Sequence, residues 1–433
     1  MKQRNVEGGA ILRRNYLLVI AIVGLALCGA SAQQAVSPSA TPAAKPLPPF
    51  FDVYSLANST APAQITDFHT IYLYSGISGP GLPVEGNGEG GWRSGSEGVL
   101  YAGNHPKPYF TLVPLSKLTT RSAVTSGLLP PIKPFMEVQV RDTVITLGGD
   151  GNYYMTGSTG ENIWAFNDGV ELWRSPDLEH WTYMGLVWSL DKEGTWEKQT
   201  RLLHDKPVRA IWAPEIHYIH HNYFICLSMT PGGIGILKSR TGKPEGPYVN
   251  ALSGDKPLAS GIDATLFEDD DGKVYFTSTS ANRITRMKDD LSGPAEPPHE
   301  IVLENPDHDP NHHAARCAGR GTNDIGNEGA VLFKANGIYY LGAADTYEGR
   351  YSTMLAMSNT IYGPYHGRHE SVPTAGGTGF FKDKQGRWWT TYFGNDEQSA
   401  WREKPGIVRV EFAPNGRVVV SKHQPFVTDS NWK

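Results

Sequence analysis

Cysteine is scarce in this chain, with three in 433 residues. Cys28 lies in an apolar N-terminal run, which leaves only Cys226 and Cys317 further on, so a scaffold held by several disulfides is excluded. The sequence does not say whether these two pair. Beyond residue 32 no apolar run is long enough to cross a bilayer, so we predict no membrane span. Sustained helical periodicity is also missing, which favours strands.

Charge is modest and slightly acidic, with 19% charged residues and a formal net charge of −5. An acidic balance argues against a polyanionic partner such as nucleic acid. Hydrophobic residues make up 39% and aromatic residues 11% of the chain, which excludes intrinsic disorder and predicts a packed core.

The N-terminus has the three parts of a secretory signal peptide. Basic residues come first, an uncharged apolar run follows from Tyr16 to Cys28, and the small residues Ala30-Ser31-Ala32 end the segment. We therefore predict a signal peptide over 1–32 and a secreted or periplasmic protein. Residues 33–49 are rich in Ala, Pro, Ser and Gln and are expected to form a linker.

Residues 50–135 contain short β-like runs, at Thr70–Tyr74 and Tyr109–Val113, separated by turns rich in glycine and proline. We predict a short β-rich N-terminal extension here, and the sequence assigns it no role. The residues from 136 to 433 are expected to form the main domain.

A repeated unit runs through the main domain. Each copy has a turn dipeptide and then a run of aromatic and β-branched residues, and Asp-Gly and Asn-Gly are strong hairpin turns. The copies recur 49 to 70 residues apart, a period that suits four-stranded units. A radial array of sheets protects the edges of so many short strands, so we predict an all-β fold, a five-bladed β-propeller. The copies are Gly151–Thr156, His221–Cys226, Gly272–Thr277, Gly337–Gly342 and Gly386–Thr391.

Three carboxylates occupy the same position relative to the turn in their copies of the repeat. The residues nine positions before the turns are Asp142, Trp212, Asp263, Glu328 and Gly377. Equivalent inner-strand positions face the propeller axis, so the carboxylates are expected to converge on one cavity beside Trp212. For any single carboxylate, the alternative to a role in this cavity is a structural one, in which it forms a hydrogen bond to a turn. A carboxylic acid, a carboxylate and an aromatic platform are typical of glycoside hydrolysis.

The segments around these carboxylates resemble glycoside hydrolase family 43, whose members are five-bladed propellers. The resemblance lies in Arg141-Asp142-Thr143, in Trp212-Ala213-Pro214-Glu215, in the run Gly261 to Phe267 and in Glu328-Gly329-Ala330. It implies that Asp142 is the general base and Glu328 the general acid. It further implies that Asp263 orients the acid and modulates its acidity.

This sequence departs from the family pattern at several positions. Thr143, Ala264 and Ala330 stand where the family usually has proline, which affects the subfamily and substrate more than the chemistry. Many members also hold a channel cation with a histidine of the last blade, and Gly377-Thr378-Gly379 occupies that neighbourhood here. We therefore predict no metal and no cofactor, with a channel cation as the alternative.

Two further segments are candidates for sugar contacts. Trp164 and Phe166 are expected to stack on sugar faces, and packing against the second blade is the alternative. A long insertion from Pro306 to Asn327 precedes Glu328 and is expected to cover the cavity, unless it is a solvated loop.

The sequence thus favours an exported inverting glycosidase that acts on plant-type poly- or oligosaccharides, with arabinofuranosides and xylosides as the first substrates to test. One alternative is a retaining propeller glycosidase of the fructan-cleaving type. Another is a non-catalytic carbohydrate-binding propeller, which would have no need of a protonated acid beside a base. The sugar linkage, exo or endo action and the oligomeric state are left open.

Overall fold

A computed structural model of the chain describes residues 71–72, 82–86, 92–95, 101–102, 129, 132, 134–136, 140–159, 167–203, 206–229, 232–304, 325–396, 399 and 404–425. Internal contacts divide the chain into two units, Met1–Pro46 and Leu47–Lys433. The predicted signal peptide and linker lie outside the described residues. Within the described ranges, no helix has the length and apolar character that crossing a membrane requires.

The predicted N-terminal extension is described only in short pieces. β1 (Ile71–Tyr72) pairs with β4 (Tyr101–Ala102), and β2 (Leu82–Gly86) pairs with β3 (Trp92–Gly95), both antiparallel. β1 falls within the predicted run Thr70–Tyr74. The other predicted run, Tyr109–Val113, lies outside the described residues.

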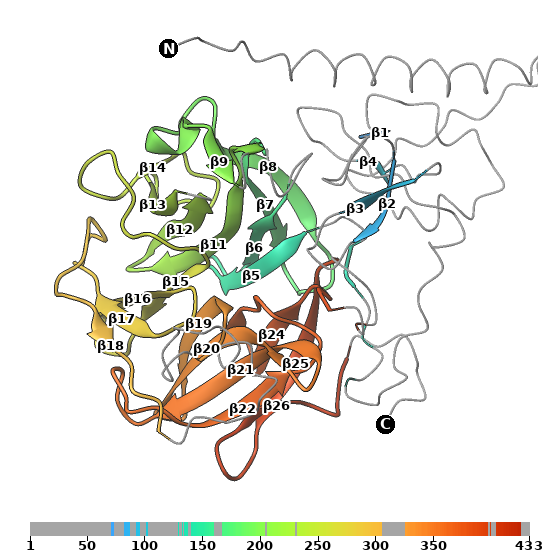
Figure 1. The fold of residues 1–433 in the computed structure, drawn as a ribbon, viewed down its shortest axis with the longest axis vertical. Coiled ribbons are helices and arrows are strands. Elements are labelled where there is room, and N and C mark those ends of the chain that lie inside the picture. Colours follow the sequence, from blue (N-terminus) through green and yellow to red (C-terminus); the bar gives the residue numbers. More distant parts are fainter. Residues whose placement is uncertain are drawn as a thin grey trace, which may run out of the picture. The chain divides into compact units, whose positions relative to one another are not determined.

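Five antiparallel sheets of four strands each follow, and they form a five-bladed propeller (Figure 1). Blade 1 has β5 (Arg141–Leu147), β6 (Tyr153–Ser158), β7 (Gly169–Ser175) and β8 (Thr182–Ser189). Blade 2 has β11 (Ile211–Ile219), β12 (Asn222–Met229), β13 (Gly233–Ser239) and β14 (Tyr248–Asn250). Blade 3 has β15 (Ala264–Glu268), β16 (Val274–Ser278), β17 (Arg283–Arg286) and β18 (His299–Glu300). Blade 4 has β19 (Glu328–Ala335), β20 (Ile338–Tyr347), β21 (Arg350–Ser358) and β22 (His366–Val372). Blade 5 has β23 (Phe380–Lys382), β24 (Trp388–Tyr392), β25 (Gly406–Phe412) and β26 (Val418–Val420).

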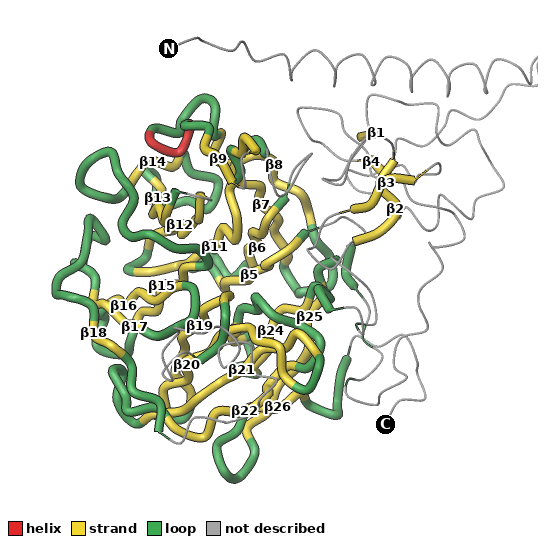
Figure 2. Tube along the Cα trace, in the orientation of Figure 1, coloured by secondary structure: helices red, strands yellow, loops and turns green. Residues whose placement is uncertain are grey.

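The repeated sequence unit coincides with the second strand of each blade, so the predicted all-β, five-bladed fold is confirmed. The turn between β19 and β20 shows the physical reason. Asn336 and Gly337 have φ values of 52° and 79°, and a two-residue type I′ hairpin needs positive φ at both positions. A loop between blades 1 and 2 holds β9 (Arg201–Leu203), β10 (Lys206–Val208) and the single short helix of the described residues, Trp196–Lys198 (Figure 2).

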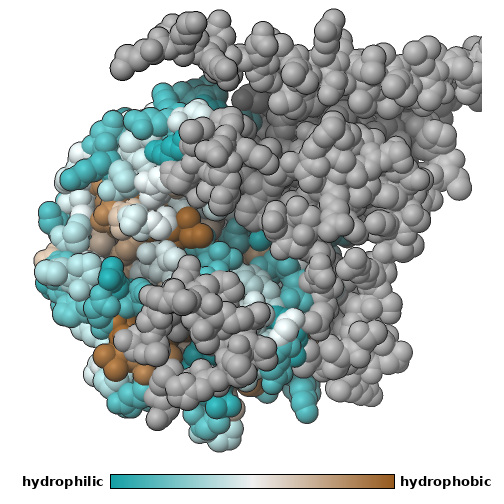
Figure 3. Space-filling view, in the orientation of Figure 1, coloured by the Kyte–Doolittle hydropathy of each residue, from teal (hydrophilic) through white to brown (hydrophobic). Residues whose placement is uncertain are grey.

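The second strand of each blade is largely buried on both faces because each blade packs between two others, whereas both residues of the outermost strand β18 are exposed. All six residues of β6 are buried, and Trp188 and Leu227 belong to one apolar cluster shared by blades 1 and 2. Burial of one such large apolar side chain stabilises a fold by about 1.5–3 kcal/mol. Among the described residues, Val249 and Val302 are the exposed large hydrophobics. Accordingly, hydrophilic residues cover most of the described surface in Figure 3.

The ring closes by packing of blade 5 against blade 1, because each sheet uses only strands that are consecutive in sequence. The Thr391 hydroxyl donates to the carbonyl oxygen of Thr143 at 2.6 Å, and the backbone N–H of Lys384 donates to the Tyr153 hydroxyl at 2.9 Å. These contacts join the last blade to the first and close the ring.

Candidate functional site

The innermost strands of three blades begin with a β-bulge. The bulges lie between Arg141 and Val144, between Trp212 and Glu215, and between Glu328 and Val331. A bulge bends its strand and changes the direction of a side chain. In these three blades the bulge therefore directs side chains at the start of the innermost strand toward the axis.

Two of the predicted catalytic carboxylates have a left-handed backbone. Asp142 has φ 50° and Asp263 has φ 53°. A non-glycine residue in this region costs on the order of 1–3 kcal/mol and persists only where its surroundings hold it. Both residues line the cavity at the axis of the propeller.

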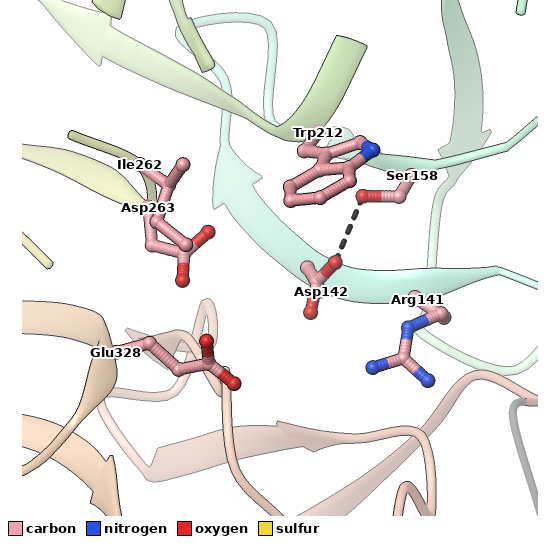
Figure 4. A pocket seen from close by; sticks show the side chains of 7 residues that line it. All are labelled: Arg141, Asp142, Ser158, Trp212, Ile262, Asp263 and Glu328. Carbon is pink, nitrogen blue, oxygen red and sulfur yellow. Dashed lines mark hydrogen bonds between the residues drawn. The ribbon is translucent and has the colours of Figure 1, made fainter. Parts of the chain in front are cut away.

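The axial cavity brings together four of the residues that the sequence singled out. Asp142, Asp263, Glu328 and Trp212 line it together with Arg141, Ser158 and Ile262, and its volume is about 50 Å³ (Figure 4). In Figure 4 the Glu328 and Asp263 carboxyl groups lie on one side of the cavity, and Asp142 lies on the other. Blades 1, 2 and 4 each contribute at least one lining residue, and Ile262 and Asp263 come from the segment directly before β15 of blade 3.

Two hydrogen bonds in series connect Asp142 to the backbone of blade 2. The Ser158 hydroxyl donates to Asp142 Oδ2 at 2.8 Å, and the backbone N–H of Ala213 donates to Ser158 Oγ at 2.7 Å. Burial raises the pKa of Asp142, and the adjacent Arg141 guanidinium and the Ser158 hydrogen bond oppose that rise. The same two groups therefore favour the ionised form that a base needs.

Asp263 is tied to the backbone beside the predicted acid. Its own N–H donates to Ser228 Oγ at 2.8 Å, and its Oδ2 accepts the N–H of Gly329 at 2.9 Å. Burial raises the pKa of Asp263 well above its usual value, and the charges of Glu328 and Asp142 raise it further. Its hydrogen bond to Gly329 orients the start of β19, where Glu328 lies.

Tyr351 contacts the predicted acid and was not found from the sequence. Its hydroxyl donates to Glu328 Oε1 at 2.5 Å, and its backbone N–H donates to Asp396 Oδ2 at 2.6 Å. Tyr351 is the second residue of β21, which begins at Arg350, and it does not share the repeat position that singled out the three carboxylates. This hydrogen bond holds the Glu328 carboxyl group in place through Oε1.

Glycines of the connection between β22 and β23 make room for these groups. A Cβ on Gly376 would lie 2.4 Å from the Tyr351 ring, and a Cβ on Gly377 would lie 2.9 Å from Asp142 Oδ1. Gly377 therefore has no room for a ligand side chain where the family resemblance implies a histidine. Across the described residues, no group of three or more His, Cys, Asp or Glu side chains is arranged to hold a metal ion.

Several residues singled out in the sequence lie outside the described residues. These are Trp164, Phe166, Cys317 and most of the insertion, of which residues 325–327 are described. Cys226 is a free, buried thiol in β12, and burial raises its pKa well above the usual value.

Comparison with known proteins agrees with this geometry. The sequence pattern of the glycosyl hydrolases family 43 matches residues 132–418. A β-D-galactofuranosidase of Aspergillus niger is 35% identical over 121 residues, which cover 22% of this chain and 35% of that protein. A xylosidase/arabinosidase of Butyrivibrio fibrisolvens is 32% identical over 152 residues, 34% of this chain and 26% of that protein. The chain thus spans about a third or less of the length of these two curated relatives.

A solved structure supports the fold. The endo-arabinase of Bacteroides thetaiotaomicron VPI-5482 is 20% identical, with a TM-score of 0.50, and the match covers 67% of this chain and 99% of that one. Since the family pattern covers most of the propeller and all three cavity carboxylates, the chain belongs to family 43 of the glycosyl hydrolases.

Proposed function

We propose that this chain is an exported glycoside hydrolase that cleaves O-glycosidic bonds with inversion at the anomeric carbon. The observation that carries the proposal is the convergence of Asp142, Asp263 and Glu328 on one cavity with Trp212 in its lining. A protonated carboxyl and a carboxylate on opposite sides of a bound sugar are the groups that glycoside hydrolysis requires.

Each carboxyl group has a distinct role in this proposal. Asp142 accepts a proton from water as that water attacks the anomeric carbon. Glu328 donates a proton to the departing glycosidic oxygen from Oε2, because Oε1 accepts the Tyr351 hydroxyl. Asp263 orients Glu328 through Gly329, and its buried carboxyl competes for protons with its neighbours.

The proposed substrates are arabinofuranosides and xylosides of plant-type oligo- or polysaccharides. The name of the Butyrivibrio relative supports these sugars. A second candidate is a galactofuranoside, because the Aspergillus relative carries that activity in its name. A panel of nitrophenyl pentosides and hexosides distinguishes these candidates by rate, and the absence of hydrolysis across the panel would favour a binding-only propeller.

The stereochemical outcome tests the mechanism. We expect the first sugar released to have the anomeric configuration opposite to that of the substrate. Water needs space between the base and the anomeric carbon, so an inverting pair stands about 6.5–9.5 Å apart, against about 5–5.5 Å for a retaining pair. Proton NMR of the product in the first minutes of hydrolysis reads the configuration directly. A product with the substrate's own configuration would refute inversion and support the retaining alternative.

The pH dependence tests the role of Arg141. Asp142 must be ionised to act as a base, so activity is lost as the pH falls through the pKa of Asp142. Burial raises that pKa, and the Arg141 guanidinium lowers it. In Arg141→Gln the acidic limb of the kcat/KM profile is therefore expected to move to higher pH, while the basic limb moves less.

The matched control for this experiment is Arg240→Gln. Arg240 is exposed in the turn after β13 and lines neither the axial cavity nor its rim. Its substitution should leave both limbs in place. An acidic limb that stays fixed, or moves to lower pH, in Arg141→Gln would contradict the assignment of Asp142 as the base.

A further inference from the structure

Tyr351 belongs to blade 4, but residues of blade 5 hold it in place. Asp396, in the connection between β24 and β25, is buried and accepts the backbone N–H of Tyr351 through Oδ2 at 2.6 Å. The preceding residue, Asn395, accepts the N–H of Gly376 through Oδ1 at 3.0 Å, and Gly376 lies directly against the Tyr351 ring. Two neighbouring side chains of this connection thus fix the backbone of Tyr351 and the residue that its ring contacts.

The Tyr351 hydroxyl is a hydrogen-bond donor toward the proposed acid, with 2.5 Å between it and Glu328 Oε1. Burial raises the pKa of Tyr351 well above its usual value, and the charge of Glu328 raises it further. The hydroxyl therefore keeps its proton through the neutral pH range. Tyr351 supplies a hydrogen bond to Glu328 and does not itself act as an acid or a base.

The Glu328 carboxyl group also faces the charges of the axial cavity. Negative charge on Glu328 raises the pKa of both Asp142 and Asp263, so these groups repel one another. The charged side chains around Glu328 come from blades 1 and 2 and from the segment before β15; they are Arg141, Asp142, Glu215 and Asp263. Charge that develops on Glu328 during proton transfer is therefore opposed by carboxylates, and Tyr351 is a neutral donor in direct contact with it.

This hydrogen bond becomes stronger as the acid gives up its proton. A hydrogen bond to an ionised acceptor is roughly twice as strong as one between neutral groups. In the proposed mechanism Glu328 is a neutral carboxylic acid before the reaction and a carboxylate after it. Interactions that are stronger in the transition state than in the ground state are the ones that accelerate the chemical step. The contact with Tyr351 is of this kind.

We propose that Tyr351 is a positioning residue for the acid step, in which its hydroxyl fixes the Glu328 carboxyl group and stabilises the carboxylate left after proton transfer, with Asp396 holding Tyr351 in place. The O–H bond of Glu328 breaks, and its proton forms a new O–H bond with the departing oxygen. That oxygen takes the electron pair of the glycosidic C–O bond, and the Tyr351 proton stays on Tyr351. The inference rests on the proposed function, since it takes Glu328 as the acid.

The test is Tyr351→Phe, which removes the hydroxyl and keeps the ring. We expect kcat/KM on an arabino- or xylo-trisaccharide to fall by about tenfold or more, the effect of losing a hydrogen bond to a charged group. On the dinitrophenyl glycoside of the same sugar, kcat/KM should change by less than about twofold, because this leaving group needs no proton.

The pH profile of the same variant separates this role from a purely structural one. Without its donor, the ionised form of the acid is less stable, so the acid stays protonated to higher pH. The basic limb of the kcat/KM profile on the trisaccharide is therefore expected to move upward by about one pH unit, while the acidic limb moves less.

Tyr339→Phe is the matched control. Tyr339 lies in β20 of the same blade, and its hydroxyl donates to Asp269 Oδ2 at 2.6 Å, outside the lining of the axial cavity. The substitution removes the same kind of hydrogen bond and should leave both rates and both limbs in place. Equal losses on the two substrates in Tyr351→Phe, or a basic limb that stays fixed or moves to lower pH, would overturn the proposal.

Asp396→Ala tests the contact that holds Tyr351. It should lower the ratio of the trisaccharide rate to the aryl glycoside rate, by less than Tyr351→Phe does. In the Tyr351→Phe background it should not lower this ratio further, because Asp396 acts through the Tyr351 hydroxyl. A further fall in the double variant would refute the role given to Asp396.

Failure of the proposed function is distinguishable from failure of this inference. If the wild-type chain hydrolyses neither substrate, the proposed function fails. Carbon-13 NMR of chains labelled at the glutamate carboxyl groups then decides the inference, with the Glu328 signal identified by its loss in Glu328→Gln. Ionisation of Glu328 at higher pH in Tyr351→Phe, but not in Tyr339→Phe, would support it, and the same titration in all chains would refute it.

Discussion

The Asp142→Asn variant is expected to lose about 10³- to 10⁴-fold in kcat/KM on every glycoside that the wild-type chain hydrolyses. The amide cannot accept a proton from the attacking water, and water must be activated whatever group departs. The loss should therefore be similar for nitrophenyl glycosides and for oligosaccharides. Steady-state rates on both substrate types measure it.

The fold of this variant is expected to remain intact. An asparagine has the size of an aspartate, tolerates a left-handed backbone and still accepts the Ser158 hydrogen bond through its side-chain oxygen. Asp290→Asn, which changes an exposed carboxylate in the turn after β17, is the matched control and should retain full activity. An Asp142→Asn variant that unfolds at the wild-type temperature and hydrolyses either substrate at the wild-type rate would exclude Asp142 as the base.

The Glu328→Gln variant is expected to lose about 10²- to 10⁴-fold on substrates with poor leaving groups and much less on activated aryl glycosides. A sugar alkoxide needs a proton as it departs, whereas nitrophenolate leaves without one. Because the glutamine can still accept the Tyr351 hydroxyl through its side-chain oxygen, the change removes the proton and largely preserves the geometry. A series of aryl glycosides of graded leaving-group acidity measures this dependence.

The two carboxyl variants are expected to differ in how their activity depends on the leaving group. The acid variant should depend steeply on the leaving group, and the base variant should not. Equal losses in both variants across the whole series would contradict the assigned roles. If activity depended steeply on the leaving group in Asp142→Asn and not in Glu328→Gln, Asp142 would be the acid and Glu328 the base.

The sequence by itself determined the fold and the identity of the central carboxylates. The Asn336-Gly337 turn and its counterparts encode hairpins locally, because each requires a backbone that few residues adopt. Their repetition predicted five blades, and a constant offset from the turn predicted that Asp142, Asp263 and Glu328 share one cavity. Both inferences needed only local turn chemistry and the rule that equivalent strands of a propeller face one axis.

Only the tertiary structure decided what surrounds these carboxylates. Tyr351 reaches Glu328 from the start of β21, and it fits because Gly376, in the connection between β22 and β23, has no side chain. Such contacts join residues of different blades and strands, and they depend on strand lengths, bulges and the closure of the ring. A repeat in the sequence fixes the position of each residue within its strand but not these distances, so the neighbours of the central carboxylates are set only once the blades are packed.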